Sequence, residues 1–171
     1  MINIALSNGD LQGDMVPVGV PSPNGPPVSQ TGIGGKPSVI LNAGNSLYSP
    51  SGAFRLTFSI PGGAVIQAVN DDTLPGQWVS GAPVTPDWVT LWTAGNTAGQ
   101  AITEIDMQAD GNFVVYAGTT PIFNSQTDQN NLNSGAFIRM QDDGDLVLFL
   151  NGQPIWNTGT NARAGGILVQ G

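Results

Sequence analysis

The sequence contains no cysteine and no histidine. Without these residues the chain cannot form a disulfide, a cysteine nucleophile, a Ser-His-Asp triad or one of the usual zinc sites. Basic residues are also scarce, because four Lys and Arg stand against twelve Asp and Glu and give a formal net charge of −8. No basic patch can form on such a chain, so we expect it to bind neither nucleic acid nor anionic membranes.

Long apolar runs are absent as well. None approaches the ~20 residues that a membrane-spanning helix needs, so we expect no membrane insertion. Residues 1–10 lack the basic region and the apolar core of a signal peptide. Either a leader was removed or replaced, or the protein leaves its cell by another route.

Glycine and proline, by contrast, are abundant, with 24 and 13 copies. No helical periodicity runs far enough to predict a helix, and this composition favours an all-β protein with many turns. Proline and glycine crowd residues 17–37, within a segment (1–44) that stands outside the repeats described below. Such a segment favours irregular, extended conformations. It fits a flexible arm, or an arm that packs on its own domain or on a neighbouring subunit. Residues 39–41 are expected to form a short strand.

Residues 105–116 predict two strands around a tight turn. Apolar side chains stand at odd positions and mostly polar ones at even positions, as expected for strands with one buried face. The same alternation of odd and even positions places the apolar side chains of both strands on one face only if the loop has an odd number of residues. A three-residue loop over 109–111 meets this condition, and Gly111 supplies the left-handed residue that such loops need. We therefore expect Met107 opposite Phe113 and Ile105 opposite Val115 in the core.

The other face of this hairpin carries Gln108, Asp110, Asn112, Val114 and Tyr116. Gln108 is expected to lie opposite Asn112. Amide, carboxylate and phenol groups around a small apolar patch can bond several hydroxyl groups while covering a C–H surface. This chemistry suits a sugar-binding site.

The same pattern recurs 33 positions later, where the outward positions are Gln141, Asp143, Asp145, Val147 and Phe149. Repeats of this length are typical of stacked or symmetric units. In this copy Asp145 replaces an asparagine, so two carboxylates would crowd one hydroxyl group. Phe149 also lacks the hydroxyl of its counterpart. We expect a degenerate second site, either weakened or vestigial.

A weaker third copy comes first in the chain. Its core positions are Leu56, Phe58, Ala64 and Ile66, around a turn at 60–62, and its outward positions are Ser59, Pro61, Gly63, Val65 and Gln67. Most hydrogen-bonding groups are missing, so this face is expected to be structural. The step to the next copy is longer because residues 70–86 are inserted. Trp78 lies in the insertion and Trp88 follows it. We favour packing over sugar stacking for both.

At this point the sequence resembles a known family. The pattern Gln108-x-Asp110-x-Asn112-x-Val114-x-Tyr116 matches every position of the mannose-binding motif of the bulb-type (monocot mannose-binding) lectins. The resemblance covers residues 45–171 as a B-lectin domain and leaves residues 1–44 as an irregular N-terminal extension. It implies an all-β, β-prism II fold, with three four-stranded antiparallel sheets around a pseudo-threefold axis.

The resemblance also implies that the aromatic residues after each repeat, Trp92, Phe123 and Trp156, fill that axis. We expect these three side chains to be buried. The same expectation holds for the apolar faces of the two later hairpins, with Met107, Phe113, Val115, Met140, Leu146 and Leu148.

For function, the resemblance implies a lectin for mannose-type glycans that acts without catalysis, cofactor or metal. Asp110 and Asn112 would bond the sugar 2-hydroxyl, Gln108 the 3-hydroxyl and Tyr116 the 4-hydroxyl, while Val114 packs on the ring carbons. An extracellular or surface-exposed location follows as an expectation.

One monosaccharide held by a few exposed hydrogen bonds binds with a Kd near ~1 mM, so biological attachment needs several sites. We therefore expect a homo-oligomer or a part of a larger assembly. Residues 165–170 read as a last strand that either completes the first sheet or is exchanged with a partner.

Three alternatives remain. A glycosidase needs two carboxyl groups across a sugar, and Glu104, Asp106 and Asp110 do lie along one face, but no pocket is implied that would raise an acid's pKa. The acidic run at 142–145 lacks the spacing of a calcium loop. A structural or assembly protein built on a partly degenerate lectin fold is the third.

Overall fold

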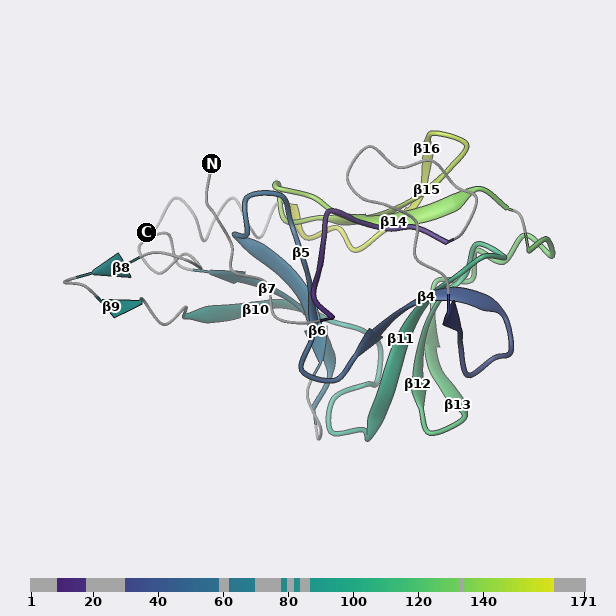
Figure 1. Cartoon of the computed structure of the whole chain (residues 1–171), viewed down its shortest axis with the longest axis horizontal. Coiled ribbons are helices and arrows are strands. Elements are labelled where there is room, and N and C mark those ends of the chain that lie inside the picture. The colour runs from purple at the N-terminus through teal and green to yellow at the C-terminus, as the bar shows by residue number, and fades with distance from the viewer. Residues whose placement is uncertain are drawn as a thin grey trace.

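The structure, a computed structural model, describes residues 9–17, 30–58, 62–69, 78–79, 82–83, 87–132 and 134–161. Its regular elements in these ranges are all strands, which confirms the all-β class (Figure 1). No helix in the described part is long and apolar enough to cross a membrane.

Three sheets make up the body of the protein. The first has the order β1 (Leu11–Gln12), β5 (Ser46–Tyr48), β6 (Phe54–Phe58), β7 (Ala64–Val69) and β10 (Trp88–Thr93). The second has the order β13 (Thr120–Asn124), β12 (Phe113–Ala117), β11 (Ile102–Gln108), β4 (Pro37–Asn42) and β3 (Gln30–Thr31). The third has the order β16 (Gln153–Asn157), β15 (Leu146–Leu150), β14 (Ala136–Met140) and β2 (Asp14–Met15). A small hairpin of β8 (Trp78–Val79) and β9 (Ala82–Pro83) extends to one end of the molecule (Figure 1).

The prism architecture is as predicted, but the strand count differs from three sheets of four. Two sheets have five strands, and β1 pairs with β5 in parallel. The difference arises in residues 9–44, which were expected to be irregular apart from a short strand at 39–41. They supply β1 to the first sheet, β2 to the third, and β3 and β4 to the second. The predicted strand at 39–41 is therefore part of β4, which pairs with five residues of β11.

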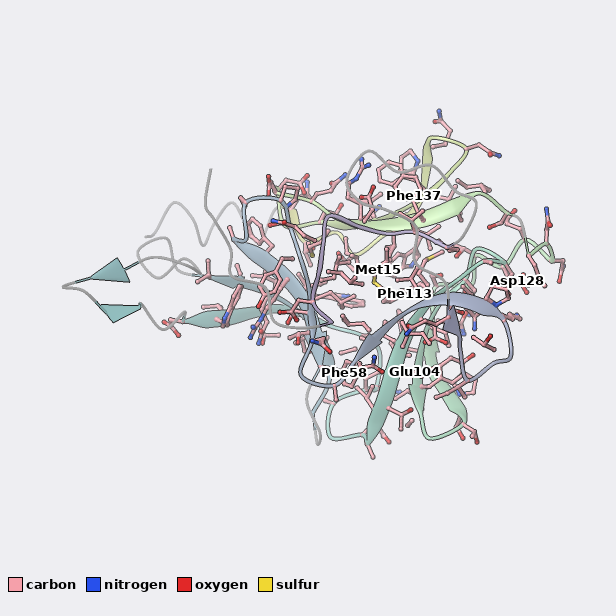
Figure 2. The ribbon with its side chains drawn as sticks, viewed as in Figure 1. Met15, Phe58, Glu104, Phe113, Asp128 and Phe137 are labelled. Carbon is pink, nitrogen blue, oxygen red and sulfur yellow. The ribbon has the colours of Figure 1, made fainter. Side chains whose placement is uncertain are left out.

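The hairpin registers agree with the alternation in the sequence. Met107 pairs with Phe113 and Ile105 with Val115. The third-sheet hairpin repeats this arrangement, with Met140 opposite Leu146. The inward side chains of the three hairpins meet in one core together with Met15 from β2. Figure 2 shows Met15 and Phe113 in the interior between the sheets, with Phe137 on the outer side of the third sheet.

The three aromatic residues at the axis meet as the resemblance implied. The ring centroids of Trp92 and Phe123 lie 5.7 Å apart, and Trp156 lies 6.3 Å from each. The expectation of burial holds only in part for these three, which are half-buried and pack against the core, whereas the other predicted core residues are buried. Large rings that pack edge to face cover one another but leave part of each ring at the surface.

Several predictions lie outside the described residues. They concern the turn residues 60–61, the outward positions Ser59 and Pro61, most of the 70–86 insertion, and the strand at 165–170. The side chain of Trp78 also lies outside the description. Trp88 packs as expected, with its ring 6.2 Å from that of Tyr48 and the Arg55 guanidinium 4.0 Å above it.

Candidate functional site

The candidate sugar site lies at the β11–β12 turn. The Gln108 N–H donates to the Asn112 carbonyl (2.9 Å), and the Gly111 N–H donates to the Gln108 carbonyl (3.0 Å). These bonds close the three-residue loop that the sequence predicts, with Gly111 at a φ of 96°. The loop turns Asp110 back onto its own strand end, where its carboxylate accepts the Asn112 N–H (3.0 Å). The turn therefore fixes the Asp110 carboxylate and Asn112 beside each other.

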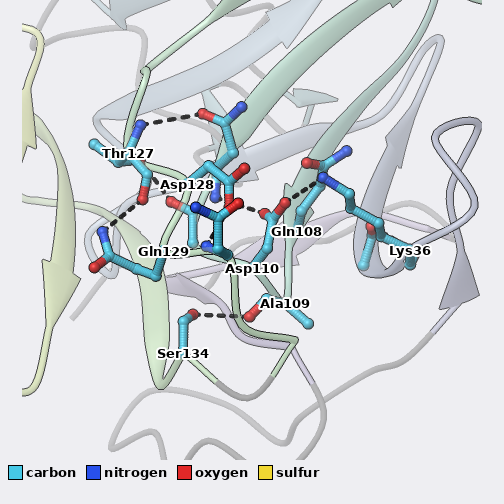
Figure 3. A network of polar contacts seen from close by, with 12 residues as sticks. Lys36, Gln108, Ala109, Asp110, Thr127, Asp128, Gln129 and Ser134 are labelled. Carbon is cyan, nitrogen blue, oxygen red and sulfur yellow. Dashed lines mark hydrogen bonds and ion pairs between the residues drawn. The ribbon is translucent and has the colours of Figure 1, made fainter.

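Asn112 anchors the chain that follows β13. Its Oδ1 accepts the Ser125 hydroxyl (3.1 Å) and the Thr127 N–H (3.3 Å). Ser125 in turn accepts the Phe113 N–H (3.0 Å), so the β12 strand and the later loop are tied together. Figure 3 shows this network around Asp110, Thr127 and Gln129. The Asn112 oxygen is thus committed to the fold, which leaves its amide nitrogen as the group available for a ligand.

The remaining motif residues are brought together as predicted, but they are covered. Gln108 donates to the Tyr116 hydroxyl through its Nε2 (2.9 Å). The exposed fractions are 2% for Gln108, 2% for Asp110, 3% for Val114 and 6% for Tyr116, and only Asn112 is partly open. A sugar-binding face was expected to be open to solvent, so its burial requires an explanation.

The cover consists of β3 and the turn that joins it to β4, residues 30–36, which we call the cap. The Gly35 N–H donates to the Gly32 carbonyl (2.9 Å) and the Gly32 N–H to the Lys36 carbonyl (3.0 Å), which closes the turn. From the cap, Lys36 forms an ion pair with the Asp110 carboxylate (Figure 3). The Ile33 N–H donates to Glu104 Oε1 (2.8 Å). The cap therefore uses hydrogen-bonding groups of the same face that the motif offers to a sugar.

Electrostatics at the site follow from this cover. The hydrogen bond and the charge of Asp110 raise the pKa of Lys36. Burial raises the pKa of the Tyr116 hydroxyl, and its bond with Gln108 opposes that shift. Both groups keep their protons at neutral pH, so Lys36 stays cationic and Tyr116 stays able to donate a hydrogen bond.

Asp106 lies beneath the cap on the same face. Its carboxyl group is fully buried, and its two oxygens accept no hydrogen bond from a described donor, so Glu104 is the partner to which the protonated group can donate. Burial, the charge of Glu104 and a hydrogen bond that the protonated carboxyl group forms with Glu104 raise the pKa of Asp106 to about 8. A paired acid and base for glycosidic cleavage would need a sugar between two carboxyl groups, whereas here the Gly32 backbone lies directly against Asp106.

The second motif copy has a different environment. Asp145 Oδ1 accepts three donors, from the Thr158 hydroxyl (3.0 Å), the Gly159 N–H (2.9 Å) and the Thr160 N–H (3.3 Å). It therefore anchors its loop as Asn112 does. Of the other positions, Gln141 is half-buried, Asp143 is exposed and Val147 is buried.

Phe149 of this copy stacks on Phe137, with ring centroids 5.4 Å apart. Arg139 lies over both rings and is paired with Asp14, at 2.7 Å and 3.1 Å. This face differs from the first in its aromatic and cationic character.

Sequence reasoning missed the residues of the cap, Gly32, Gly34 and Lys36, and the loop anchors Ser125 and Thr127. The anchors had a signal, because Thr158 and Thr160 stand 33 positions after them. Lys36 had a weaker one, as one of four cations in an acidic chain.

A scan against protein-family models gives no match, and a search of curated proteins gives none either. Solved structures do match. A lectin of Marasmius oreades is 23% identical, with a TM-score of 0.55 over 72% of this chain and 87% of that one. A structure described as a monomeric monocot mannose-binding lectin of Gastrodia elata is 26% identical, with a TM-score of 0.51 over 71% of this chain and 92% of that one.

These likenesses establish the class of fold. The chain has the three-sheet prism of the bulb-type lectins, which confirms the resemblance seen in the sequence. Both neighbours are described as lectins, and the one from Gastrodia elata, at 26% identity, indicates a binding protein without catalysis. Among the described residues, no group of three or more acidic side chains is placed to hold a metal ion.

Proposed function

We propose that the protein is a lectin for mannose-type glycans and that Gln108, Asp110, Asn112, Val114 and Tyr116 form its site. The observation that carries the proposal is the convergence of these five side chains at one hairpin end, in a fold shared with a mannose-binding lectin. Four of them offer hydrogen-bonding groups to hydroxyls, and Val114 offers an apolar surface for the ring carbons.

The arrangement of Asn112 gives a sharp test. Asn112→Asp keeps the side-chain oxygen that accepts the Ser125 hydroxyl and the Thr127 N–H, as Asp145 does in the second copy. It replaces the amide donor by a second acceptor and adds a charge beside Asp110. The variant should fold like the parent and lose most of its sugar affinity, by about tenfold or more for one lost bond to a polar hydroxyl and one added repulsion.

The measurement is a calorimetric titration with methyl α-mannoside, supported by a glycan array. Asn96→Asp is the matched control, because it adds the same charge at an exposed turn. If the parent and Asn112→Asp bind equally, the sugar lies elsewhere.

A second candidate function has an observation in its favour. The cap occupies the motif face and buries it, as expected if a former lectin site now serves as an intramolecular contact. The protein would then be a structural or assembly protein on a partly degenerate lectin fold. Absence of glycan binding in every variant, with a defined oligomer in solution, would favour this alternative.

Assembly and location complete the proposal. With one intact motif, useful attachment needs several copies, so we propose that the protein acts as a homo-oligomer or within a larger assembly outside the cell. Light scattering on the purified chain tests the first part. The proposal of an oligomer would be contradicted if the purified chain is a monomer and its affinity for glycan-coated surfaces equals its affinity for soluble mannose-type glycans.

A further inference from the structure

We propose that residues 30–36 are a displaceable cap that competes with the sugar for the motif face, so that the lectin is self-inhibited until the cap lifts. This inference rests on the proposed function, because it concerns regulation of the same site. It is carried by the contacts of Lys36, Gly34 and Gly32 with that face.

The charge of the cap is complementary to the site. Lys36 places its ammonium group on the carboxylate oxygen of Asp110 that does not accept the Asn112 N–H. That oxygen is the free acceptor that the site would offer to a sugar hydroxyl. The Lys36 ammonium group therefore takes the place of a sugar hydroxyl at this oxygen. It gives the Asp110 carboxylate a hydrogen-bond donor in the absence of sugar.

The shape of the cap depends on two glycines. A methyl group on Gly34 would lie 2.6 Å from the Tyr116 hydroxyl and 3.2 Å from Gln108 Nε2. A methyl group on Gly32 would lie 2.1 Å from an oxygen of Asp106. The backbone of the cap thus lies directly on three polar side chains of the site face, and no sugar ring fits between them.

The cap is held weakly compared with the strand that follows it. β3 consists of two exposed residues, and its pairing with β4 covers only Gln30 and Thr31. The Lys36 side chain is 37% exposed whereas that of Asp110 is 3% exposed, so the lysine side of the ion pair stays open to solvent. β4, by contrast, is an inner strand paired along its length with β11. The cap can therefore lift about the start of β4 while the prism stays intact.

Two substitutions weaken the cap without changing a motif residue. Gly34→Ala pushes the turn off Tyr116, and Lys36→Met removes the ion pair. Thr31→Ala is the matched control, because Thr31 is exposed and lies in the same hairpin.

Apparent affinity is the intrinsic affinity multiplied by the open fraction. If the closed form exceeds the open form about ten to one, either change should tighten binding of methyl α-mannoside by up to about tenfold. The control should bind like the parent. Asn112→Asp added to Gly34→Ala should abolish the gain.

The titrations separate the two hypotheses. If the parent binds, Asn112→Asp does not, and Gly34→Ala and Lys36→Met bind no tighter than the parent, the lectin site stands and the cap inference is overturned. If no variant binds any mannoside, the proposed function fails. Hydrogen exchange then tests, without a sugar, whether the cap can be displaced.

The exchange experiment follows the Ile33 amide, which donates to Glu104 in the closed form. In Gly34→Ala this amide should exchange much faster than in the parent, while the amides of β11 and β12 keep their protection. In a sugar-binding parent, saturating mannoside should have the same effect. Unchanged Ile33 protection in Gly34→Ala, or loss of protection across β11 and β12 as well, would show that the segment is a fixed part of the sheet and would overturn the proposal.

Discussion

The Asp106 carboxyl group should make the stability of this protein fall as pH rises from about 4 to about 8. The group is fully buried under the cap, accepts no hydrogen bond from a described donor and lies beside Glu104, and its pKa rises from 3.8 to about 8. Between these two values the unfolded chain releases the Asp106 proton while the folded chain keeps it. The folded state therefore binds more protons, and stability decreases with pH across this window and levels off above it.

The magnitude follows from the shift. The folded and unfolded values differ by about 4 pKa units, and each unit corresponds to ~1.36 kcal/mol, so the largest possible effect is about 5 kcal/mol. The lifting of the cap that we propose would admit water to the carboxylate and relieve much of this cost. We expect about 2–3 kcal/mol to remain between pH 4.5 and pH 8.5.

The substitution that isolates this effect is Asp106→Asn, which keeps the shape of the side chain and cannot ionise. Urea unfolding at pH 4.5, 6.5 and 8.5 should show the variant near the parent at low pH and more stable than the parent at high pH. Asp143→Asn is the control, because Asp143 is exposed. If the difference between Asp106→Asn and the parent does not change with pH, Asp106 is not held neutral and the reasoning is refuted.

Three further predictions concern the axis, the N-terminal strands and metals. Trp156→Ala should lower the free energy of unfolding in urea by about 2–4 kcal/mol, because its ring packs 5.8 Å from that of Phe113. Ile155→Ala, at an exposed neighbour, should be nearly neutral, and equal losses in the two variants would contradict this. Asp14→Asn should lower the free energy of unfolding by about 1–3 kcal/mol, because it leaves Arg139 without the carboxylate that ties β2 to β14. An unchanged midpoint of urea unfolding would contradict this. EDTA should leave mannoside affinity unchanged, because direct hydrogen bonds form the site; a loss that calcium restores would contradict this.

The hairpins and their core could be predicted because local rules determine them. A period of two, combined with an odd loop length and a glycine at the loop's third position, leaves one register for residues 105–116, and the structure has that register. The repeat at 33 then carries the same reasoning to the third sheet. Such inferences need only neighbouring residues and the alternation of strand faces.

The cap could not be predicted in this way. Its contacts join residues far apart in the chain, with 74 positions between Lys36 and Asp110 and 71 between Ile33 and Glu104. A segment rich in Pro and Gly lacks the alternation that reveals a strand. Gly34 is needed in the cap because a side chain at this position would collide with Tyr116. Only the folded structure shows this close approach. The sequence therefore predicted which residues share the motif face without predicting what covers them.

The same structure explains how a motif copy can lose its sugar chemistry and keep its fold. The side-chain oxygen of Asn112 accepts hydrogen bonds from the loop that follows β13. The side-chain oxygen of Asp145 does the same in the second copy, for the loop that follows β16. An exchange of asparagine for aspartate at this position removes only the outward donor, so folding does not oppose it. The loop anchor therefore explains why side chains of the same size stand at this position in both repeats of this chain, whereas the nitrogen of Asn112 is the group that the proposed site offers to a sugar. A motif of this kind should be judged by its donor at this position, and by that criterion the β11–β12 face is the one to test for mannose.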